Sequence, residues 1–382
     1  MTDERRKIVF VPAWYPNEFQ PGLGTFSPIV ADVIARRFRS AVLFVHFHDD
    51  AKRGTWMDVT TRGEVLEVRR YVHRRFRAGF LFPLLYGFHF WRAYERLEHE
   101  MGRPDLLYLG SLLPGGIGAL MARARRGIPY ATIEYFSGFS DSMRSRVKRL
   151  LVGRVLKRAA LNSAVGGPMR ETILGFFKRV QIEVNTNVIE VKEPCCPDSI
   201  RAAGKIEDGA KMIFVGNLVE VKGWDILLEA LALYSERYGS GLSLTMIGGG
   251  EEAALTRKVE ALGLGDVVKH IGRQPHEEVL KQISAHHFLA LPSRVDTCPN
   301  VILEAHREGR PVLATRCGGP EDLVNEADGI LVDKNSSADL AEGMHEMITR
   351  YGDFNPDTII EQVRRDHRLE VLLDFLSRAL DR

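Results

Sequence analysis

The chain has 382 residues, of which 45% are hydrophobic and 27% are charged, a composition typical of globular domains and not of disordered chains. Its formal net charge of +2 at pH 7 gives no indication of a polyanion binder, so no nucleic-acid partner is expected. The length suffices for two domains, and the most apolar segment, residues 78–91, is too short to span a membrane. The charged residues 1–7 run directly into a strand-like segment, so we expect no signal peptide.

Short apolar runs alternate with helical patterns through the first half of the chain. This alternation predicts a parallel sheet built from strand–helix–strand units. The predicted strands are residues 7–12, 40–47, 65–72, 105–109, 129–133 and 162–165. The predicted helical segments are residues 27–38, 84–94, 119–126 and 144–158, with residues 110–118 expected as a loop.

The loop between the first predicted strand and the first helix has the sequence WYP…GTF and carries Tyr15, Gly24 and Thr25. Loops in this place lie at the carboxyl ends of parallel strands, where ligands bind in doubly wound sheets. The loop lacks the GxGxxG pattern, so a dinucleotide site is not predicted. A plain strand–helix turn is the alternative interpretation.

Two basic tracts contain interleaved aromatic or aliphatic residues. Such tracts are usually solvated faces, but they also favour contact with an anionic membrane surface. Nucleic-acid binding is the weaker interpretation, because no recognition motif accompanies the charges. The first tract covers residues 69–82, and the second comprises Arg144, Arg146, Lys148, Arg149, Arg154, Lys157 and Arg158.

The second half repeats the strand–helix alternation after a proline-containing segment, residues 190–209, which we interpret as a crossover and linker. Lys222 and Gly223 lie between a predicted strand, 212–216, and a predicted helix, 224–238. A lysine at a helix start adds a point charge to the helix-end amides, which favours phosphate binding over a solvent-facing side chain. Further strands are predicted at residues 242–247, 267–271, 288–292, 310–315 and 329–332, and helices near 251–262, from 276, 299–309, from 320, 338–350 and 356–382.

Residues 291–324 combine two acids and a glycine pair. Asp296 and Glu304 are separated by seven residues, and Gly318 and Gly319 lie between a predicted strand and a predicted helix start. Acids that face sugar hydroxyls beside amides that face phosphate would make a nucleotide-sugar site. The alternative is an ordinary strand–helix–strand unit with a surface acid and a capping glycine pair.

This stretch resembles the acid-x7-acid signature of GT-B glycosyltransferases of the large retaining group called family 4. The resemblance is strongest over residues 213–324 and extends more loosely over nearly the whole chain. It implies an α/β fold of the GT-B type, with two Rossmann-like, doubly wound domains facing a central cleft. Three positions depart from the family's usual pattern: Asp296 replaces a Glu, Asn217 replaces an Arg, and Tyr135 replaces a His that follows the acid at Glu134.

The resemblance implies roles for individual residues. Asp296, Glu304 and Lys222 would be the catalytic set, with Glu304 accepting from ribose hydroxyls and Asp296 from sugar hydroxyls. Tyr15, Thr25, Glu134 and Tyr135 would lie on the acceptor side. The donor would contact Gly24, Gly216, Asn217, Lys222, Gly248, Gly272, Asn300, Val301, Glu304, Gly318 and Gly319.

The implied reaction moves a sugar from a nucleotide-diphosphate donor, a UDP-sugar in preference to a GDP-sugar, to a hydroxyl acceptor with retention of configuration. No cofactor and no metal are expected, because no DxD motif is suitably placed in the first domain. The first basic tract favours a lipid-linked acceptor in bacterial-type glycan or glycolipid assembly, with peripheral membrane contact. The alternatives are a soluble small-molecule acceptor and a catalytically degenerate protein that binds a nucleotide sugar without turning it over.

The predicted domains are residues 1–189 on the acceptor side and 210–355 for the nucleotide sugar, joined by 190–209, with a helical tail, 356–382, that crosses back to the first domain. Four cysteines lack paired metal spacing, and Cys195 and Cys196 are adjacent, which suits neither a zinc site nor an easy disulfide. Reduced thiols are therefore expected, in the cytoplasm or at the inner face of the membrane.

Overall fold

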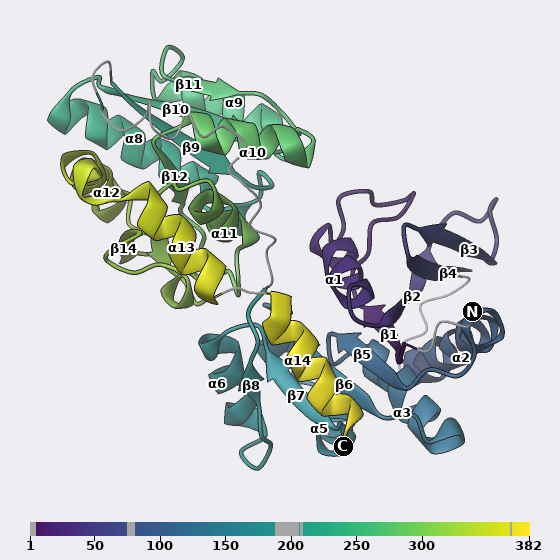
Figure 1. The fold of residues 1–382 in the computed structure, drawn as a ribbon. Coiled ribbons are helices and arrows are strands. Elements are labelled where there is room, and N and C mark those ends of the chain that lie inside the picture. The colour runs from purple at the N-terminus through teal and green to yellow at the C-terminus, as the bar shows by residue number, and fades with distance from the viewer. Residues whose placement is uncertain (1–4, 75–80, 188–205, 207–208, 367–368) are drawn as a thin grey trace. The chain divides into compact units, whose positions relative to one another are not determined.

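The structure is a computed structural model that describes residues 5–74, 81–187, 206, 209–366 and 369–382. Its contacts divide the chain into two compact units: unit 1 comprises Met1–Val188 and Leu369–Arg382, and unit 2 comprises Ile189–Arg368. The predicted linker lies almost entirely outside the described residues, as do Cys195 and Cys196. Each unit is an α/β layer structure with its own sheet (Figure 1).

Unit 1 contains an eight-stranded sheet of order β3-β4-β2-β1-β5-β6-β7-β8, which is parallel except for the antiparallel pair β3 and β4. Its strands are β1 (Lys7–Pro12), β2 (Arg39–His48), β3 (Trp56–Arg62), β4 (Val65–His73), β5 (Leu106–Gly110), β6 (Tyr130–Glu134), β7 (Leu161–Ala164) and β8 (Glu183–Val184). Its helices are α1 (Phe26–Ala35), α2 (Phe82–Met101), α3 (Gly115–Arg126), α4 (Phe139–Ser142), α5 (Arg146–Arg158), α6 (Gly167–Phe176) and α14 (Leu369–Leu380).

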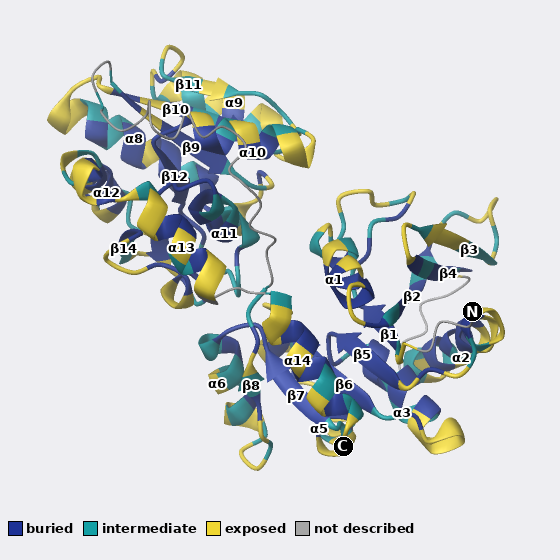
Figure 2. Cartoon of the chain, in the orientation of Figure 1, coloured by how far each residue is buried: buried dark blue, intermediate teal, exposed yellow. Residues whose placement is uncertain are grey.

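Helices cover both faces of this sheet. The ring of Tyr108 on β5 contacts Phe375 of α14, whereas Leu109 approaches Gly115 of α3. Since successive side chains of a strand point to opposite faces, α14 and α3 cover opposite sides. Every residue of β5 and β6 is buried, as the continuous apolar runs predicted, and the strands accordingly appear dark blue in Figure 2.

Several elements of unit 1 differ from the predictions, among them the short helix α4 and the short strand β8, which were not predicted. No strand was predicted at β3, whose side chains are half-buried or exposed and include the polar Asp58, Thr60 and Thr61, so its apolar alternation is weak. Helix α3 begins at Gly115, inside the segment predicted as a loop. The glycines there serve close packing and not a turn, because a Cβ on Gly116 would lie 2.6 Å from Val155 of α5.

Unit 2 contains a six-stranded parallel sheet of order β11-β10-β9-β12-β13-β14. Its strands are β9 (Ala210–Val215), β10 (Leu242–Ile247), β11 (Val268–His270), β12 (Phe288–Leu291), β13 (Val312–Arg316) and β14 (Gly329–Asp333). Its α-helices are α8 (Trp224–Tyr238), α9 (Glu252–Ala261), α10 (His276–Ala285), α11 (Asn300–Arg307), α12 (Ser337–Thr349) and α13 (Pro356–Asp366), and its 3₁₀ turns are η2 (Glu220–Lys222), η3 (Pro320–Asp322) and η4 (Tyr351–Asp353).

The helix predicted from residue 320 is only the 3₁₀ turn η3. Helix growth stops because Asn325 donates from both its backbone N–H and Nδ2 to the Asp328 carboxylate, at 2.7 and 2.6 Å. This side-chain turn replaces the next helical turn. The predicted tail of residues 356–382 consists of two helices: α13 packs on α11 in unit 2, and α14 packs on α1, β5 and β6 in unit 1.

Candidate functional site

The strand order of unit 2 reverses between β9 and β12. In an open parallel sheet the loops that leave two such strands diverge, and ligands bind in the crevice at their carboxyl ends. The loop after β9 leads to Lys222, and the loop after β12 leads to Asp296. These side chains meet there: Lys222 Nζ donates to Asp296 Oδ2 at 2.6 Å. The switch point of unit 2 is therefore lined by a cation and a carboxylate.

The two loops are held together by backbone contacts. Gly223 has φ +68°, and a Cβ there would lie 2.0 Å from the carbonyl oxygen of Pro292, so only glycine fits. Arg294 donates its backbone N–H to Val221 O at 2.8 Å and binds both carboxylate oxygens of Asp225 at 2.8 and 2.7 Å. The start of α8 is thereby fixed against the loop after β12.

Three predicted donor-binding glycines come together at the carboxyl ends of neighbouring strands. Gly216 follows β9, Gly248 follows β10 and Gly272 follows β11. Gly248 has φ +146° and donates its N–H to Gly272 O at 3.0 Å, and a Cβ on it would lie 1.8 Å from Gly216 O. These glycines permit close backbone approach. Asn217, next in the chain after Gly216, is exposed.

The glycine pair after β13 lies against the loop that carries Asp296. Gly319 donates its N–H to the backbone oxygen of Asp296 at 2.7 Å, and Gly318 donates its N–H to the Glu321 carboxylate at 2.9 Å. Both amides predicted to meet a phosphate thus have partners within the protein. A phosphate at Gly318 would have to displace the Glu321 side chain.

Helix α11 carries the second acid of the pair. Asn300 and Val301 form its first turn and are half-buried. Glu304 lies one turn further, and its Oε1 is 3.1 Å from Nε2 of His276 at the start of α10. The hydrogen bond to Glu304 raises the pKa of His276 above its ordinary value. No sequence pattern indicated His276 as a partner of this acid.

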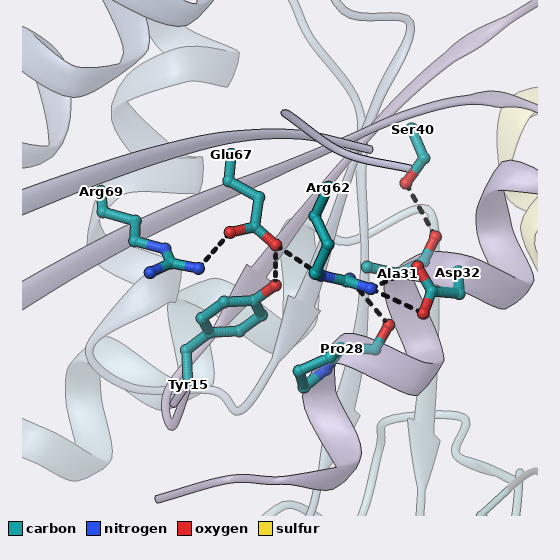
Figure 3. Close-up of polar contacts among 8 residues, drawn as sticks. All are labelled: Tyr15, Pro28, Ala31, Asp32, Ser40, Arg62, Glu67 and Arg69. Atoms are coloured by element: carbon teal, nitrogen blue, oxygen red, sulfur yellow. Dashed lines mark hydrogen bonds and ion pairs between the residues drawn. The ribbon is translucent and has the colours of Figure 1, made fainter. Parts of the chain in front are cut away.

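In unit 1, the loop between β1 and α1 is anchored by the buried carboxylate of Glu67. Tyr15 donates its hydroxyl to Glu67, which also accepts from Arg62 Nε at 2.8 Å and from Arg69 (Figure 3). Arg62 in turn binds both carboxylate oxygens of Asp32 on α1, at 2.8 and 2.7 Å. This set of contacts, called here the Glu67 network, joins the loop to β3, β4 and α1.

The predicted acceptor-side residues of this loop therefore have different surroundings. Tyr15 is only 1% exposed, so it anchors the loop and has almost no surface for an acceptor. Thr25 is exposed at the start of α1. Gly24 has φ +62° and lies against the backbone of Trp14, whose carbonyl oxygen would be 2.4 Å from an added Cβ.

Glu134 ends β6 and is buried. Its carboxylate accepts from the Ser111 hydroxyl at 2.9 Å and from the N–H groups of Leu112, Tyr135 and Phe136 at 2.8–3.0 Å. Burial raises the pKa of Glu134, and these donors oppose the rise. Because it joins the loops after β5 and β6, Glu134 acts as a structural anchor. Tyr135 is half-buried, with its ring 5.0 Å from that of Phe26.

A cavity of about 630 Å³ lies next to this anchor, at the β1–β5 switch point of unit 1. Its polar lining includes Glu134, Ser111 and Lys148, and most of its wall is apolar. This wall could not be predicted from the sequence, because its residues come from separate segments of the chain. The wall includes Trp14, Phe82, Leu112, Leu113, Ile117, Phe136, Phe139, Met143, Val147, Leu151 and Val152.

The two basic tracts differ in exposure. In the first, Arg69 belongs to the Glu67 network, Arg74 binds Asp49 at 2.9 and 2.5 Å, and Tyr71 is buried. Residues 75–80 of that tract lie outside the described residues. In the second, the first turns of α5 expose basic side chains together with Val147 and Leu150, which are 64% and 57% exposed. The second tract is thus the more open one.

Among the described residues, no three His, Cys, Asp or Glu side chains gather where they could hold a metal ion. In the same part of the chain, no helix has the length and apolarity needed to cross a bilayer.

Comparison with known proteins gives matches over part of the sequence and over the whole fold. Residues 197–364 match the family model "Glycosyl transferases group 1". The D-inositol 3-phosphate glycosyltransferase of Corynebacterium urealyticum is 33% identical over 161 residues, covering 40% of this chain and 38% of that protein. D-inositol 3-phosphate glycosyltransferase 1 of Catenulispora acidiphila is 28% identical over 270 residues, covering 65% and 64%. The matches to both relatives thus span less than two thirds of their length.

Among solved structures, sucrose-phosphate synthase from Thermosynechococcus elongatus superposes with a TM-score of 0.75 at 18% identity, covering 98% of this chain and 99% of that one. The Anabaena protein Alr3699/HepE in complex with UDP gives a TM-score of 0.73 at 19% identity, with the same coverage. At these identities the likeness establishes the fold, which is GT-B with two Rossmann-like units.

Proposed function

We propose that this chain, whose residues 197–364 match the model of the group 1 glycosyl transferases and whose fold is GT-B, transfers a sugar from a nucleoside diphosphate to a hydroxyl acceptor. The observation that carries the proposal is the meeting of Lys222 and Asp296 at the switch point of unit 2. Lys222 is a cation suited to a diphosphate, and Asp296 is an acid suited to sugar hydroxyls. The two lie side by side at the carboxyl ends of the strands, where parallel sheets bind nucleotides.

Charge on the leaving group sets the chemical requirement. Cleavage of the bond between the anomeric carbon and the phosphate leaves a diphosphate anion and a cation-like sugar, so preorganised donors must meet the growing negative charge. Lys222 supplies a point charge, and removal of such a donor typically costs about 3–4 kcal/mol of transition-state stabilisation. In this proposal, Glu304 accepts from the ribose hydroxyls, and Gly318 offers its amide once Glu321 has moved.

We propose a UDP-sugar donor in preference to a GDP-sugar, retention of configuration and no requirement for a metal. The UDP preference is supported by the fold likeness to Alr3699/HepE, which has been solved with UDP and with UDP-glucose. Retention follows from the resemblance to the retaining family. Metal independence is supported by the lack of a suitably placed DxD motif in the first domain, with Lys222 as the candidate to supply the positive charge that a metal would otherwise provide.

We further propose that the acceptor carries an apolar part that binds in the cavity of unit 1. The cavity has a largely apolar wall and the exposed Lys148 in its lining, which suits an amphipathic molecule such as a lipid-linked sugar. Its rim includes Val147 and Lys148 of α5, so the exposed apolar and basic side chains of this helix stand beside the opening. A helix of this kind favours an anionic membrane surface.

The donor proposal is tested by thermal shift with UDP, GDP, ADP, dTDP and CDP, alone and as sugar conjugates, with and without EDTA. One nucleotide should raise the melting temperature regardless of EDTA, and its sugar conjugate should be consumed when lipid-linked acceptors are added. Glu304→Ala should weaken this binding, whereas Glu277→Ala, which removes an exposed acid on α10, should not. Binding without turnover would favour the degenerate protein, and the absence of any shift would overturn the proposal.

The membrane proposal is tested by sedimentation with vesicles of phosphatidylcholine, with or without phosphatidylglycerol. The wild type should sediment only with the anionic vesicles, and a Val147→Asp, Leu150→Asp double variant should stay in the supernatant. Equal sedimentation with both vesicle types, or none with either, would favour a soluble acceptor.

A further inference from the structure

In the proposed function, Lys222 binds the diphosphate of the donor and Asp296 binds its sugar. In the structure these two side chains form an ion pair with each other. Lys222 Nζ donates to Asp296 Oδ2, and the other oxygen, Oδ1, accepts the N–H of Thr297 at 3.1 Å. Both side chains are largely buried, with 28% of Lys222 and 12% of Asp296 exposed. Both carboxylate oxygens of Asp296 therefore have protein partners, and the cation of the site is already neutralised.

The backbones that carry this pair cannot separate at low cost. The start of α8 touches the loop after β12 through Gly223, and the hydrogen bond from Arg294 to Val221 O closes the same contact. The bidentate ion pair between Arg294 and Asp225 adds a further link. A change of partner at Lys222 must therefore come from side-chain rotation and not from loop opening.

We propose that a nucleoside diphosphate displaces Asp296 from Lys222, and that this exchange frees Asp296 Oδ2 to accept a hydroxyl of the transferred sugar. This inference rests on the proposed function, because it assumes that a diphosphate binds at the switch point. A diphosphate carries more negative charge than one carboxylate, so it competes effectively for a lysine that offers a compact point charge. Once Lys222 binds the diphosphate, Asp296 Oδ2 has lost its hydrogen-bond donor and is free to accept a sugar hydroxyl of the donor.

This exchange has two consequences for the reaction. Sugar recognition by Asp296 depends on a diphosphate at Lys222, so a free sugar should not occupy the site alone. After transfer, no sugar remains to satisfy Asp296, and the carboxylate competes again for Lys222. Asp296 therefore weakens the hold on the nucleoside diphosphate product and promotes its release.

A double-mutant cycle separates this exchange from simple charge repulsion. The probe is the one of UDP, GDP, ADP, dTDP and CDP that most stabilises the wild type, with its dissociation constant measured by calorimetry. Asp296→Asn should tighten binding by about tenfold, a coupling of the size seen between contacting charges. In a Lys222→Met background, the same Asp296→Asn change should alter the dissociation constant by less than about twofold.

The sugar conjugate of the same nucleotide provides a second readout. Asp296→Asn should gain less affinity for the conjugate than for the diphosphate, because it loses the acceptor for the sugar hydroxyl. Asp296→Ala repeats the test without a side-chain amide, and a melting temperature within the wild-type range shows that each variant folds. Both variants are compared with Glu277→Ala, which removes an exposed acid on α10.

Unchanged or weaker diphosphate binding in both Asp296 variants would overturn the exchange, since Asp296 would then position Lys222 and not compete for it. Tightening that persists in the Lys222→Met background would overturn it too, in favour of plain repulsion. If neither the wild type nor Asp296→Asn binds any of the five nucleotides, the proposed function itself fails.

Discussion

The two units place their candidate sites by the same rule but build them from opposite chemistry. Among the parallel strands of each sheet the order reverses at one point, between β1 and β5 in unit 1 and between β9 and β12 in unit 2. At that point unit 2 presents an ion pair and closely packed glycines, whereas unit 1 presents a cavity with a mostly apolar wall. The shared topology sets the place of a site, and the loops set its chemistry.

The contacts that hold the loops of the two sites in place differ as well. In unit 2 the loops are held by backbone contacts at glycines, such as Gly223 against Pro292, and by the Arg294–Asp225 ion pair, so Lys222 and Asp296 are not needed to hold them. In unit 1 the loop after β1 is held by the Glu67 network, where the ionic side chains are themselves the support. The Lys222–Asp296 pair of unit 2 is proposed to bind the donor, whereas the Glu67 network of unit 1 stabilises the fold, and this contrast can be tested.

The largest expected effect is loss of the Glu67 network. Glu67→Ala leaves Arg62, Arg69 and the Tyr15 hydroxyl without their buried acceptor, and we expect a loss of about 3–5 kcal/mol in the free energy of unfolding. Asp32→Ala, which removes an exposed partner of Arg62, should cost less than about 1 kcal/mol. Urea unfolding at pH 7 measures both. Equal costs would mean that the buried carboxylate is not the support.

This support also has a defined pH dependence. Burial alone would raise the pKa of Glu67, but the hydrogen bonds from Tyr15 and Arg62 hold it below the ordinary value. A depressed pKa contributes stability above the unfolded value of about 4.3, and that contribution is lost as the pH falls through the folded pKa. The difference in stability between wild type and Glu67→Ala should therefore shrink under acid.

In contrast to Glu67→Ala, Lys222→Ala should cause a large loss of activity and little loss in the free energy of unfolding. Removing a donor to the developing diphosphate charge should lower kcat/KM by about 10²- to 10³-fold. Lys281→Ala, at an exposed position on α10, is the matched control and should leave kcat/KM unchanged. Steady-state kinetics with the identified donor measures the effect. A loss of less than tenfold would remove Lys222 from the catalytic set.

Neighbouring leucines of α5 test the cavity of unit 1. Leu151 lines the cavity, whereas Leu150 is exposed and does not. Leu151→Asn should raise the KM for a detergent-dispersed acceptor about tenfold, since burying a leucine side chain is worth about 1.5–3 kcal/mol. Leu150→Asn should leave that KM unchanged and affect only an acceptor held in vesicles. A similar KM for both variants would place the acceptor elsewhere.

The smallest expected effect concerns His276 and Glu304. The hydrogen bond from His276 to Glu304 raises the pKa of the imidazole, so its contribution to stability is present below the unfolded pKa of about 6.5 and is lost as the pH rises through the folded pKa. Because His276 is half-exposed, the contribution should be under about 1 kcal/mol. Melting temperatures of wild type and His276→Ala at pH 5.5 and 8.5 measure it. A difference that does not vary with pH would contradict the ion pair.

Much of the fold could be predicted because its signals are local. Apolar residues alternate with Ser243 and Thr245 along β10 and recur at helical spacing in α8, and both elements have the predicted bounds for this reason. Helix α3 was missed at its start because glycine packing and a glycine turn look alike in sequence. The strand β3 was missed because an edge strand needs little apolar alternation.

The candidate site of unit 2 was predictable as a set of residues but not as a set of contacts. Asp296, Glu304, Gly318 and Gly319 fall within one short stretch, where spacing and turn chemistry are visible. Two contacts could not be predicted: the hydrogen bond between His276 and Glu304, and the one from the Gly318 N–H to Glu321. Both depend on how neighbouring loops pack. The cavity of unit 1 had no comparable signal.

The amino-acid sequence by itself determined the two α/β units, the order of their elements and the motif residues of unit 2, because apolar periodicity and turn residues act within a few positions of the chain. Only the tertiary structure decided which side chains meet. Lys222 and Asp296 are 74 positions apart, and Tyr15 and Glu67 are 52 apart. Such pairs form only after the strands take their order in the sheet. The same ordering buries Tyr15 and Glu134 as supports, because a polar group enclosed by packing must find its partner inside the protein.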